Sequence, residues 1–140
     1  MAICTAASLL AACGGYHGLT KAQFVSQADG ICKTFDAKFS ALFGHVSSTP
    51  TLAEVQGIYK DQAIPVFLAE VVQLRALKPP KADRATVKRI LDELSAGVDQ
   101  LDSAVRAARS LKTLEGIVPD GLKRASADAK VYGLTTCGSS

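Results

Sequence analysis

The sequence predicts an all-α domain, an antiparallel four-helix bundle whose second helix is kinked or split at Pro65. Two observations lead to this fold class. Apolar residues recur at spacings of three and four along four segments, which is the pattern of amphipathic helices. No stretch alternates apolar and polar residues as a half-buried strand does. Because only short loops separate the four segments, neighbouring helices are expected to run in opposite directions.

The first helix is expected to begin at Thr20. Thr20 followed by Gln23 is a capping box, in which side chain and backbone exchange hydrogen bonds at a helix N-terminus. Gly44 and the polar run up to Pro50 end this helix. The apolar residues between these limits follow helical spacing and predict its buried face: Phe24, Ala28, Ile31, Phe35, Phe39 and Leu42.

A second helical segment runs from the capping box of Thr51 and Glu54 to Leu77, where two prolines follow. Pro65 lies inside it. An interior proline costs a helix about 3 kcal/mol because it removes a hydrogen bond and crowds the preceding turn. We therefore expect a bend near Ile64, or two short helices.

The third helix, about 83–112, has the most regular pattern. Its apolar residues alternate spacings of four and three and predict a seam against other helices: Val87, Leu91, Leu94, Val98, Leu101, Val105 and Ala108. Arg89 with Glu93, and Asp102 with Arg106, have the i,i+4 spacing of surface ion pairs. Gly116 ends the pattern.

A fourth, weaker helix is expected over about 120–132, with Gly133 as its C-terminal stop. Its predicted inward-facing residues are Leu122, Ala125, Ala129 and Tyr132. The chain has 48% hydrophobic residues, enough for a core. Its net charge of +3, with both signs interspersed, does not favour a nucleic-acid partner. No apolar run approaches the roughly 20 residues of a membrane span.

Leu10-Ala11-Ala12-Cys13, followed by two glycines, resembles the lipobox of bacterial lipoproteins. The resemblance implies a signal segment 1–12, a lipidated Cys13 with a tether 13–19, and a helical domain 20–140. It also implies an extracytoplasmic protein anchored by lipid to the outer face of the bacterial cell membrane. No Lys or Arg precedes Cys13, whereas secretory signals begin with basic residues. We therefore expect the signal segment to be truncated, with the true start codon upstream.

The lipobox also sorts the four cysteines, which otherwise allow three pairings. Processing would remove Cys4 and block Cys13, which leaves Cys32 and Cys137. An even pair in an exported chain predicts a disulfide, and neither cysteine has the Cys-x-x-Cys context of a redox site. Gly30 is expected to let the C-terminal tail approach the first helix.

Three further segments resemble a family of secreted actinobacterial lipoproteins. They are Lys21-Ala22-Gln23-Phe24 through Ala28-Asp29-Gly30-Ile31-Cys32, Leu-Arg-Ala-Leu-Lys-Pro-Pro at 74–80, and Tyr132-Gly133-Leu134-Thr135-Thr136-Cys137-Gly138. The resemblance covers nearly all of the mature chain and is most specific around the two cysteines. That family is all-helical and has no assigned biochemical activity. The resemblance therefore implies the location and the disulfide, and no chemistry.

Residues with catalytic potential form no recognisable motif. The sequence lacks Gly-x-Ser-x-Gly, His-Glu-x-x-His and a glycine-rich phosphate loop. His17 and His45 have no second ligand at metal-binding spacing. We therefore expect neither an enzyme nor a metal or other cofactor.

Six basic residues surround the two prolines between the second and third helices: Arg75, Lys78, Lys81, Arg84, Lys88 and Arg89. With few acids nearby in the sequence, this basic corner is expected to meet anionic lipid head groups or an anionic cell-wall polymer. The alternative is an ordinary solvated corner that keeps the protein soluble.

Two functional hypotheses remain open. The first is a non-catalytic envelope lipoprotein that binds a partner or a small apolar ligand, in a crevice of the bundle near Pro65. The second is an envelope enzyme, or a metal or ligand carrier, whose site the sequence does not reveal. An apolar groove would favour the first hypothesis, and a deep cleft with a buried, unpaired acid or histidine would favour the second.

Overall fold

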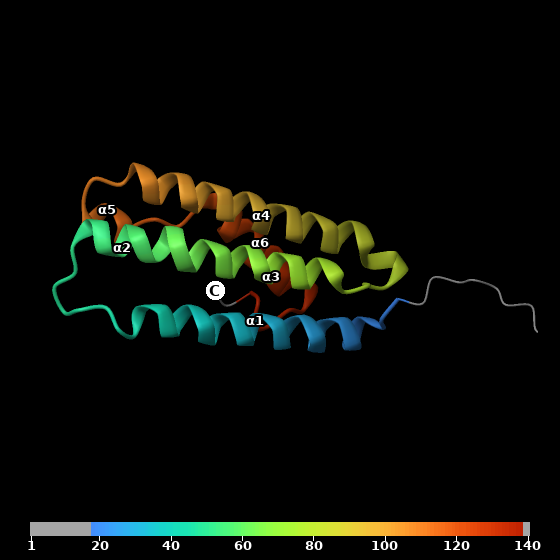
Figure 1. Cartoon of the computed structure of the whole chain (residues 1–140). Helices are drawn as coiled ribbons and strands as arrows, with labels where there is room; N and C mark the ends of the chain where they lie inside the picture. The colour runs from blue at the N-terminus through green and yellow to red at the C-terminus, as the bar shows by residue number, and fades with distance from the viewer. Residues whose placement is uncertain (1–17, 139–140) are drawn as a thin grey trace, which may run out of the picture.

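The computed structural model describes residues 18–138, and over that range it contains helices and loops but no strand (Figure 1). The predicted all-α class is confirmed. The predicted signal segment 1–12, the lipidation site Cys13 and the tether up to His17 lie outside the described residues. The domain boundary expected at residue 20 falls one residue before the first helix.

Helix α1 spans Lys21–Phe43 and begins with the predicted capping box. The Thr20 hydroxyl oxygen accepts a hydrogen bond from the Gln23 N–H at 3.2 Å, and the Gln23 side chain accepts one from the Thr20 N–H at 3.0 Å. These bonds satisfy donors that have no partner within the helix. The helix buries one face, formed by Phe24, Ala28, Cys32 and Phe35.

The segment from Leu52 to Ala76 is helical throughout but changes pitch just before Pro65. It divides into α2 (Leu52–Ile58), a π-helical turn (Tyr59–Ala63) and α3 (Ile64–Ala76). Pro65 lacks an N–H and its ring crowds the carbonyl four residues back, so regular α-helical bonding fails there. The wider turn accommodates the ring, since the Ile64 N–H donates to the Tyr59 carbonyl, five residues earlier. The split expected near Ile64 therefore takes the form of a π turn.

Helix α4 (Arg84–Ala107) carries the predicted seam and follows a 3₁₀ turn, Lys81–Asp83. All the predicted seam residues are buried except Leu94, which is half-buried. The helix ends five residues earlier than the predicted 112, because Ser110 starts a new helix, α5 (Leu111–Glu115). The Ser110 hydroxyl oxygen caps α5 by accepting a hydrogen bond from the Thr113 N–H at 3.2 Å.

The last helix, α6 (Asp120–Tyr132), ends as predicted at Gly133, whose φ of 111° is the left-handed conformation that suits glycine. Ala125, Ala129 and Tyr132 are buried, as expected. The Tyr132 hydroxyl donates a hydrogen bond to Asp83 at 2.7 Å and so fastens the end of α6 to the turn before α4.

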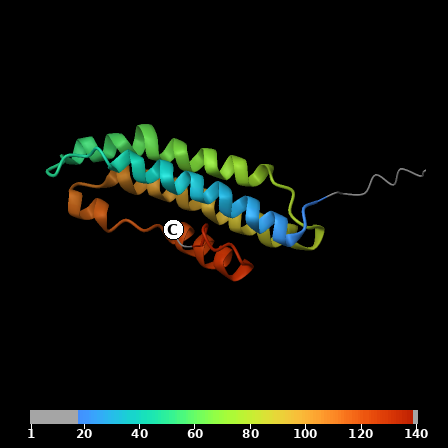
Figure 2. The ribbon, with the colours of Figure 1, turned by 90° about the horizontal axis from the view of Figure 1, so that it is seen from below.

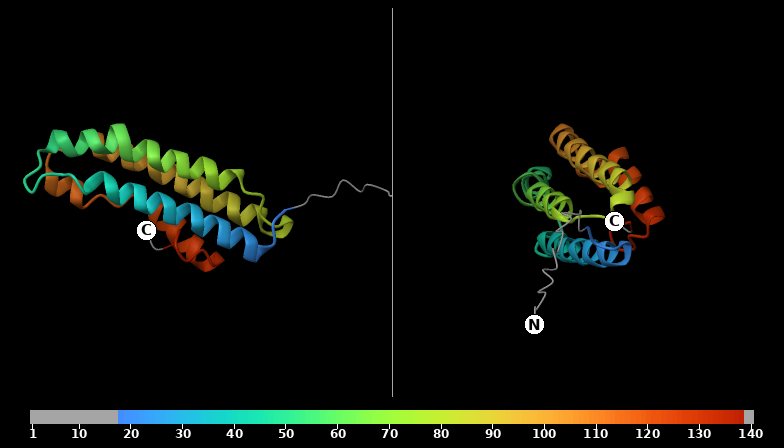
Figure 3. Two further views of the ribbon diagram at one scale, coloured as in Figure 1. Left: turned by 60° about the horizontal axis from the view of Figure 1, so that its bottom comes forward. Right: turned by 90° about the vertical axis from the view of Figure 1, so that its right-hand side faces the viewer.

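The long helices lie side by side as a helical bundle (Figures 1 and 3). Helix α1 contacts α3, α3 contacts α4, and α4 contacts α6, which covers one side of the bundle (Figure 2). Buried side chains form two clusters along its length. One lies near the C-terminal tail and includes Phe24, Leu74, Ile90 and Leu134; the other includes Ile64, Val98, Val105 and Leu114.

Helices α4 and α6 meet backbone to backbone at Gly97 and Gly121. A Cβ atom on Gly97 would lie 2.4 Å from the Leu122 nitrogen, and one on Gly121 would lie 2.6 Å from the Gly97 Cα. The Gly121 N–H donates to the Gln100 side chain at 3.0 Å. The contact therefore requires glycine on both helices, and a side chain on either one would force them apart.

Gly97→Ala is expected to lower the free energy of unfolding by about 1–3 kcal/mol, the usual range for overpacking. Gly57→Ala is the matched control, because Gly57 is also helical but has nothing within 4 Å of the position that a Cβ would occupy. There the better helix propensity of alanine should stabilise by up to about 1 kcal/mol. Urea unfolding followed by circular dichroism measures both. Equal stabilisation by the two changes would show that the α4–α6 contact is not tight.

The C-terminal tail is held to α1 by Asp29. Its carboxylate accepts hydrogen bonds from the N–H and hydroxyl of Thr135 at 3.0 and 2.9 Å. It also accepts from the N–H groups of Thr136 and Cys137 at 2.9 and 3.3 Å. Burial alone would raise the pKa of Asp29, but these bonds to Thr135, Thr136 and Cys137 outweigh it and lower the pKa below its usual value.

Gly30 does not have the role expected for it. The residue is exposed, and nothing lies within 4 Å of the position that a Cβ would occupy. The expectation was wrong because polar bonds to Asp29, rather than a gap at Gly30, bring the tail to α1. A small residue is needed instead where the tail folds back on α6, because a Cβ on Gly138 would lie 2.8 Å from the Leu134 carbonyl oxygen and 2.9 Å from the Lys130 nitrogen.

Candidate ligand cavity

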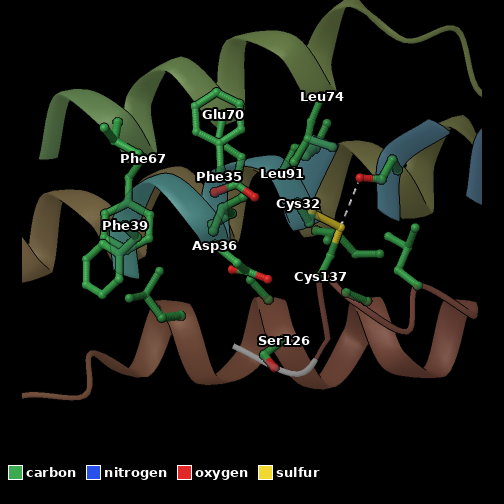
Figure 4. A pocket seen from close by; sticks show the side chains of 18 of the residues that line it. Cys32, Phe35, Asp36, Phe39, Phe67, Glu70, Leu74, Leu91, Ser126 and Cys137 are labelled. Carbon is green, nitrogen blue, oxygen red and sulfur yellow. Dashed lines mark hydrogen bonds between the residues drawn. A yellow bond between two sulfur atoms is a disulfide. The ribbon is translucent and has the colours of Figure 1, made fainter. Parts of the chain in front are cut away.

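A cavity of about 420 Å³ lies inside the bundle between α1, α3, α4, α6 and the C-terminal tail (Figure 4). It reaches Val66 and Phe67, next to Pro65, where the sequence suggests a crevice. Small residues help to explain the space. Helix α1 contributes Ala28 to the wall, and α6 contributes Ala125 and Ala129. Side chains of this size leave a gap that the neighbouring leucine and phenylalanine side chains do not fill.

The wall of the cavity is mostly apolar. Its hydrophobic residues come from all four helices and the tail: Phe24, Phe35, Phe39, Val66, Phe67, Leu74, Val87, Ile90, Leu91, Leu94, Leu122 and Leu134, with the three alanines. Most of these side chains are buried in the core cluster near the tail. A cavity of this size and polarity falls in the range of small-molecule sites, about 300–1,000 Å³.

Glu70 places a carboxyl group in this apolar cavity (Figure 4). It lies on α3 and is only 9% exposed. Within residues 18–138 its side chain forms no hydrogen bond or ion pair. Burial raises the pKa of Glu70 to about 7, and the negative charge of Asp36 contributes to the rise. A charged carboxylate in such a position is unfavourable, because burial weakens its hydration and no group in the described part of the chain donates a hydrogen bond to it.

The mouth of the cavity is more polar. Asp36 and Ser40 of α1 line it from exposed positions, opposite the half-buried Val66 and Phe67 of α3. Ser126 of α6 also lines the cavity, but its hydroxyl donates to the Gly138 carbonyl at 2.8 Å. The exposed part of the lining therefore lies on α1, with Asp36 at the mouth of the cavity and the buried Glu70 further inside.

The predicted disulfide between Cys32 and Cys137 is confirmed and forms part of the cavity wall. The Cα atoms are 5.3 Å apart, and the bond joins residues separated by 105 positions in the chain. Cys32 is buried on α1, and Cys137 reaches it from the tail that Asp29 holds. The bond thus fixes the segment that closes one side of the cavity.

Sequence reasoning missed Glu70, although a signal was present. Residues 62–74 contain one charged residue, Glu70, within an otherwise uncharged run. A helix that is apolar on all sides is buried on most of them. A lone acid in such a helix is therefore a candidate for a buried functional group.

The six residues of the basic corner do not act as one free patch. Arg75 and Lys88 both form ion pairs with Asp92, and Arg89 pairs with Asp128 of α6 at 2.9 Å. The premise that few acids lie nearby was wrong, because α4 itself supplies Asp92, four residues after Lys88, and α6 brings Asp128, which is distant in sequence. For the same reason Arg89 does not make the expected pair with Glu93, whereas Asp102–Arg106 is present at 2.9 Å. Lys78 and Lys81 are exposed at the turn, near Arg84.

Residues 18–138 offer neither a metal site nor a membrane span. No group of three or more His, Cys, Asp or Glu side chains in that range is arranged to hold a metal ion. His45 lies in the loop after α1, and His17 lies outside the described residues. No helix in the same range has both the length and the apolar character to cross a membrane.

Comparison of the chain with protein-family models, with curated proteins and with solved structures finds no match.

Proposed function

We propose that this chain is a non-catalytic lipoprotein of the bacterial cell envelope that binds a small, largely apolar molecule in the cavity of its helical bundle. The observation that carries the proposal is the cavity of about 420 Å³, enclosed by apolar side chains from four helices and by the tail. Burial of a hydrocarbon ligand there would contribute about 25 cal/mol for each Å² of apolar surface removed from water. The alternative is an envelope enzyme, or a metal or ligand carrier, and the buried acid Glu70 is the feature that would favour it. We assign Glu70 to ligand recognition instead.

The envelope location rests on the lipobox-like Leu10-Ala11-Ala12-Cys13 and on the disulfide, since disulfides persist in oxidising compartments. The resemblance to secreted actinobacterial lipoproteins supports the same location. We also infer that the helices form the antiparallel four-helix arrangement, because the connection from α3 to α4 is short enough to require a reversal of direction.

The basic corner lies where the chain enters the domain. The Leu19 N–H donates to the Lys78 carbonyl at 2.8 Å, so the last residue of the tether is fastened to the turn that carries Lys78 and Lys81. A lipid on Cys13 would hold this end of the bundle toward the membrane. We infer that the two exposed lysines then contact anionic head groups or an anionic wall polymer.

Ligand binding is tested with the neutral fluorescent probe N-phenyl-1-naphthylamine and a full-length Cys13→Ala chain, which needs no detergent. The unmodified cavity should bind the probe and enhance its fluorescence. Ala125→Leu fills the cavity and should weaken binding about tenfold or more, whereas Ala127→Leu, exposed on the same helix, should not change it. Absence of binding to the unmodified cavity, or equal binding by both variants, would reject the cavity as a ligand site.

Lipidation is tested by expression in a bacterial host with a basic segment added before Met1. The chain should partition into detergent, and Cys13→Ala should move it to the aqueous phase, because the thiol that receives the lipid is removed. Cys4→Ala is the matched control and should leave partitioning unchanged. Retention of the Cys13→Ala chain in the detergent phase would rule out a lipid anchor at this residue.

Contact of the basic corner with anionic surfaces is tested on vesicles that contain phosphatidylglycerol. Lys78→Gln with Lys81→Gln should weaken binding, and binding of the unmodified protein should fall with salt, since exposed charges are screened over about 10 Å at 0.1 M. Lys60→Gln with Lys112→Gln, on other elements of the bundle, is the control. If both double variants lost vesicle binding equally, the effect would come from net charge and not from the basic corner.

A further inference from the structure

The charged groups that line the cavity are all acidic. Glu70 and Asp36 contribute carboxyl groups, and no Lys, Arg or His among residues 18–138 lines the wall. Asp36 is exposed at the mouth, and Glu70 lies further inside. Fatty acids or other anionic ligands would therefore add a third negative charge to a wall without a positive one.

The Glu70 carboxyl group has no hydrogen-bond donor or positive charge beside it among residues 18–138. The side chain is nine-tenths buried, lines the cavity, and makes no hydrogen bond or ion pair with residues 18–138. A carboxylate in that position gains most from a ligand that brings both a positive charge and N–H donors, because charge-assisted hydrogen bonds are the strong ones. A wall with acidic but no basic side chains among residues 18–138 thus favours a cationic head group.

Aromatic rings accompany the two acids. Phe35, Phe39 and Phe67 line the same part of the cavity, and the rings of Phe39 and Phe67 lie 5.1 Å apart between centroids (Figure 4). The face of an aromatic ring attracts an ammonium group through its negative quadrupole. Carboxylates combined with aromatic rings form the kind of environment that recognises organic cations.

We propose that the cavity is selective for amphiphiles with a protonated amine head group, which pairs with Glu70 and Asp36 while the hydrocarbon body lies against the apolar wall of α1, α3, α4 and α6. This inference rests on the proposed function, because it specifies the ligand of the same cavity. The amine enters past Asp36, and its N–H groups donate hydrogen bonds to the Glu70 carboxylate.

Three ligands with one hydrocarbon chain and different head groups test the proposal: dodecylamine, dodecanol and dodecanoate. Each is titrated at pH 8, below its micelle concentration or solubility limit, into the Cys13→Ala chain loaded with N-phenyl-1-naphthylamine. The amine is expected to displace the probe at about tenfold lower concentration than the alcohol, and the carboxylate is expected to be the weakest.

The variant Glu70→Gln tests whether the preference for the amine depends on Glu70. The change keeps the shape and removes the charge, so amine affinity should fall about tenfold while alcohol affinity changes by less than about twofold. Asp36→Asn should reduce amine affinity less, because Asp36 is exposed. Glu115→Gln, an exposed acid at the end of α5, should leave all three affinities unchanged.

The outcomes separate this inference from the function on which it rests. No binding of the probe or of any of the three ligands overturns the proposed function. Binding of the probe without an amine preference, or an amine preference that survives Glu70→Gln, overturns the inference alone. Preference for the carboxylate would likewise contradict it and would point to a fatty-acid ligand.

Discussion

Loss of the Cys32–Cys137 disulfide is expected to lower the free energy of unfolding by about 4–5 kcal/mol while most of the helical content remains. The bond joins residues 105 positions apart, and in the chain-entropy model closure of a loop near 100 residues removes that much freedom from the unfolded chain. Helix α4 keeps its seam against α3 and α6 without the bond, since Val98 and Val105 are buried by apolar contacts. The melting temperature should therefore fall without loss of the far-ultraviolet helical signal.

The comparison is best made in a chain whose Cys4 and Cys13 are already alanine, so that no other thiol can pair. Cys32→Ala with Cys137→Ala removes the bond, and the parent chain with both cysteines is the control. Chemical denaturation gives the free energies, and mass mapping of the parent should find the two peptides joined. Equal denaturation midpoints, or free thiols at both positions in the parent, would contradict the prediction.

Glu70→Gln is expected to stabilise the empty protein by about 3 kcal/mol at pH 8 and to have no such effect at pH 4. The pKa of Glu70 rises from its ordinary 4.5 to about 7 on folding, and each unit corresponds to about 1.4 kcal/mol. Below pH 4.5 the group is protonated in both states, so folding carries no penalty. Between pH 4.5 and 7 the folded state holds the extra proton, and stability falls as the pH rises. Above pH 7 the penalty is complete.

Denaturant unfolding at several pH values between 4 and 8 measures the difference between the two proteins. Asp36, the other acid that lines the cavity, contributes to the raised pKa, so Asp36→Asn should recover a smaller part of the stability at pH 8. Glu115→Gln, exposed on α5, should show no pH-dependent difference. Parallel stability curves for Glu70→Gln and the unmodified protein would show that Glu70 is not desolvated.

Local rules were sufficient for most of the helices. The capping boxes at Thr20 and Thr51 and the left-handed stop at Gly133 each depend on residues within one turn, and the structure confirms all three. The same rules do not predict the end of α4, because one of the groups that bonds its last carbonyls is about 50 residues away in the sequence. The Gln56 side chain of α2 donates to the carbonyls of Val105 and Ala108 at 2.7 and 3.2 Å and satisfies the helix end.

The cavity could be predicted only as a crevice near Pro65, because its volume depends on which small residues meet in space. Ala28 and Ala125 are ordinary helix formers in the sequence. That both line the same cavity is seen only after the helices pack. The Gly97–Gly121 contact and the pairing of Arg89 with Asp128 are unpredictable for the same reason. Each depends on the relative placement of α4 and α6, which periodicity does not determine.

The two ends of the domain share one wall of the cavity, and this determines when the cavity comes into existence. Phe24 and Cys32 belong to the first helix, whereas Leu134 and Cys137 are among the final residues of the chain. At about 5–20 residues per second, the ribosome would complete the second group roughly 5–20 seconds after the first. The cavity wall therefore stays incomplete until the tail segment has been synthesised. A ligand of the kind proposed would find a closed cavity only where the tail has docked on α1 and its thiol has been oxidised.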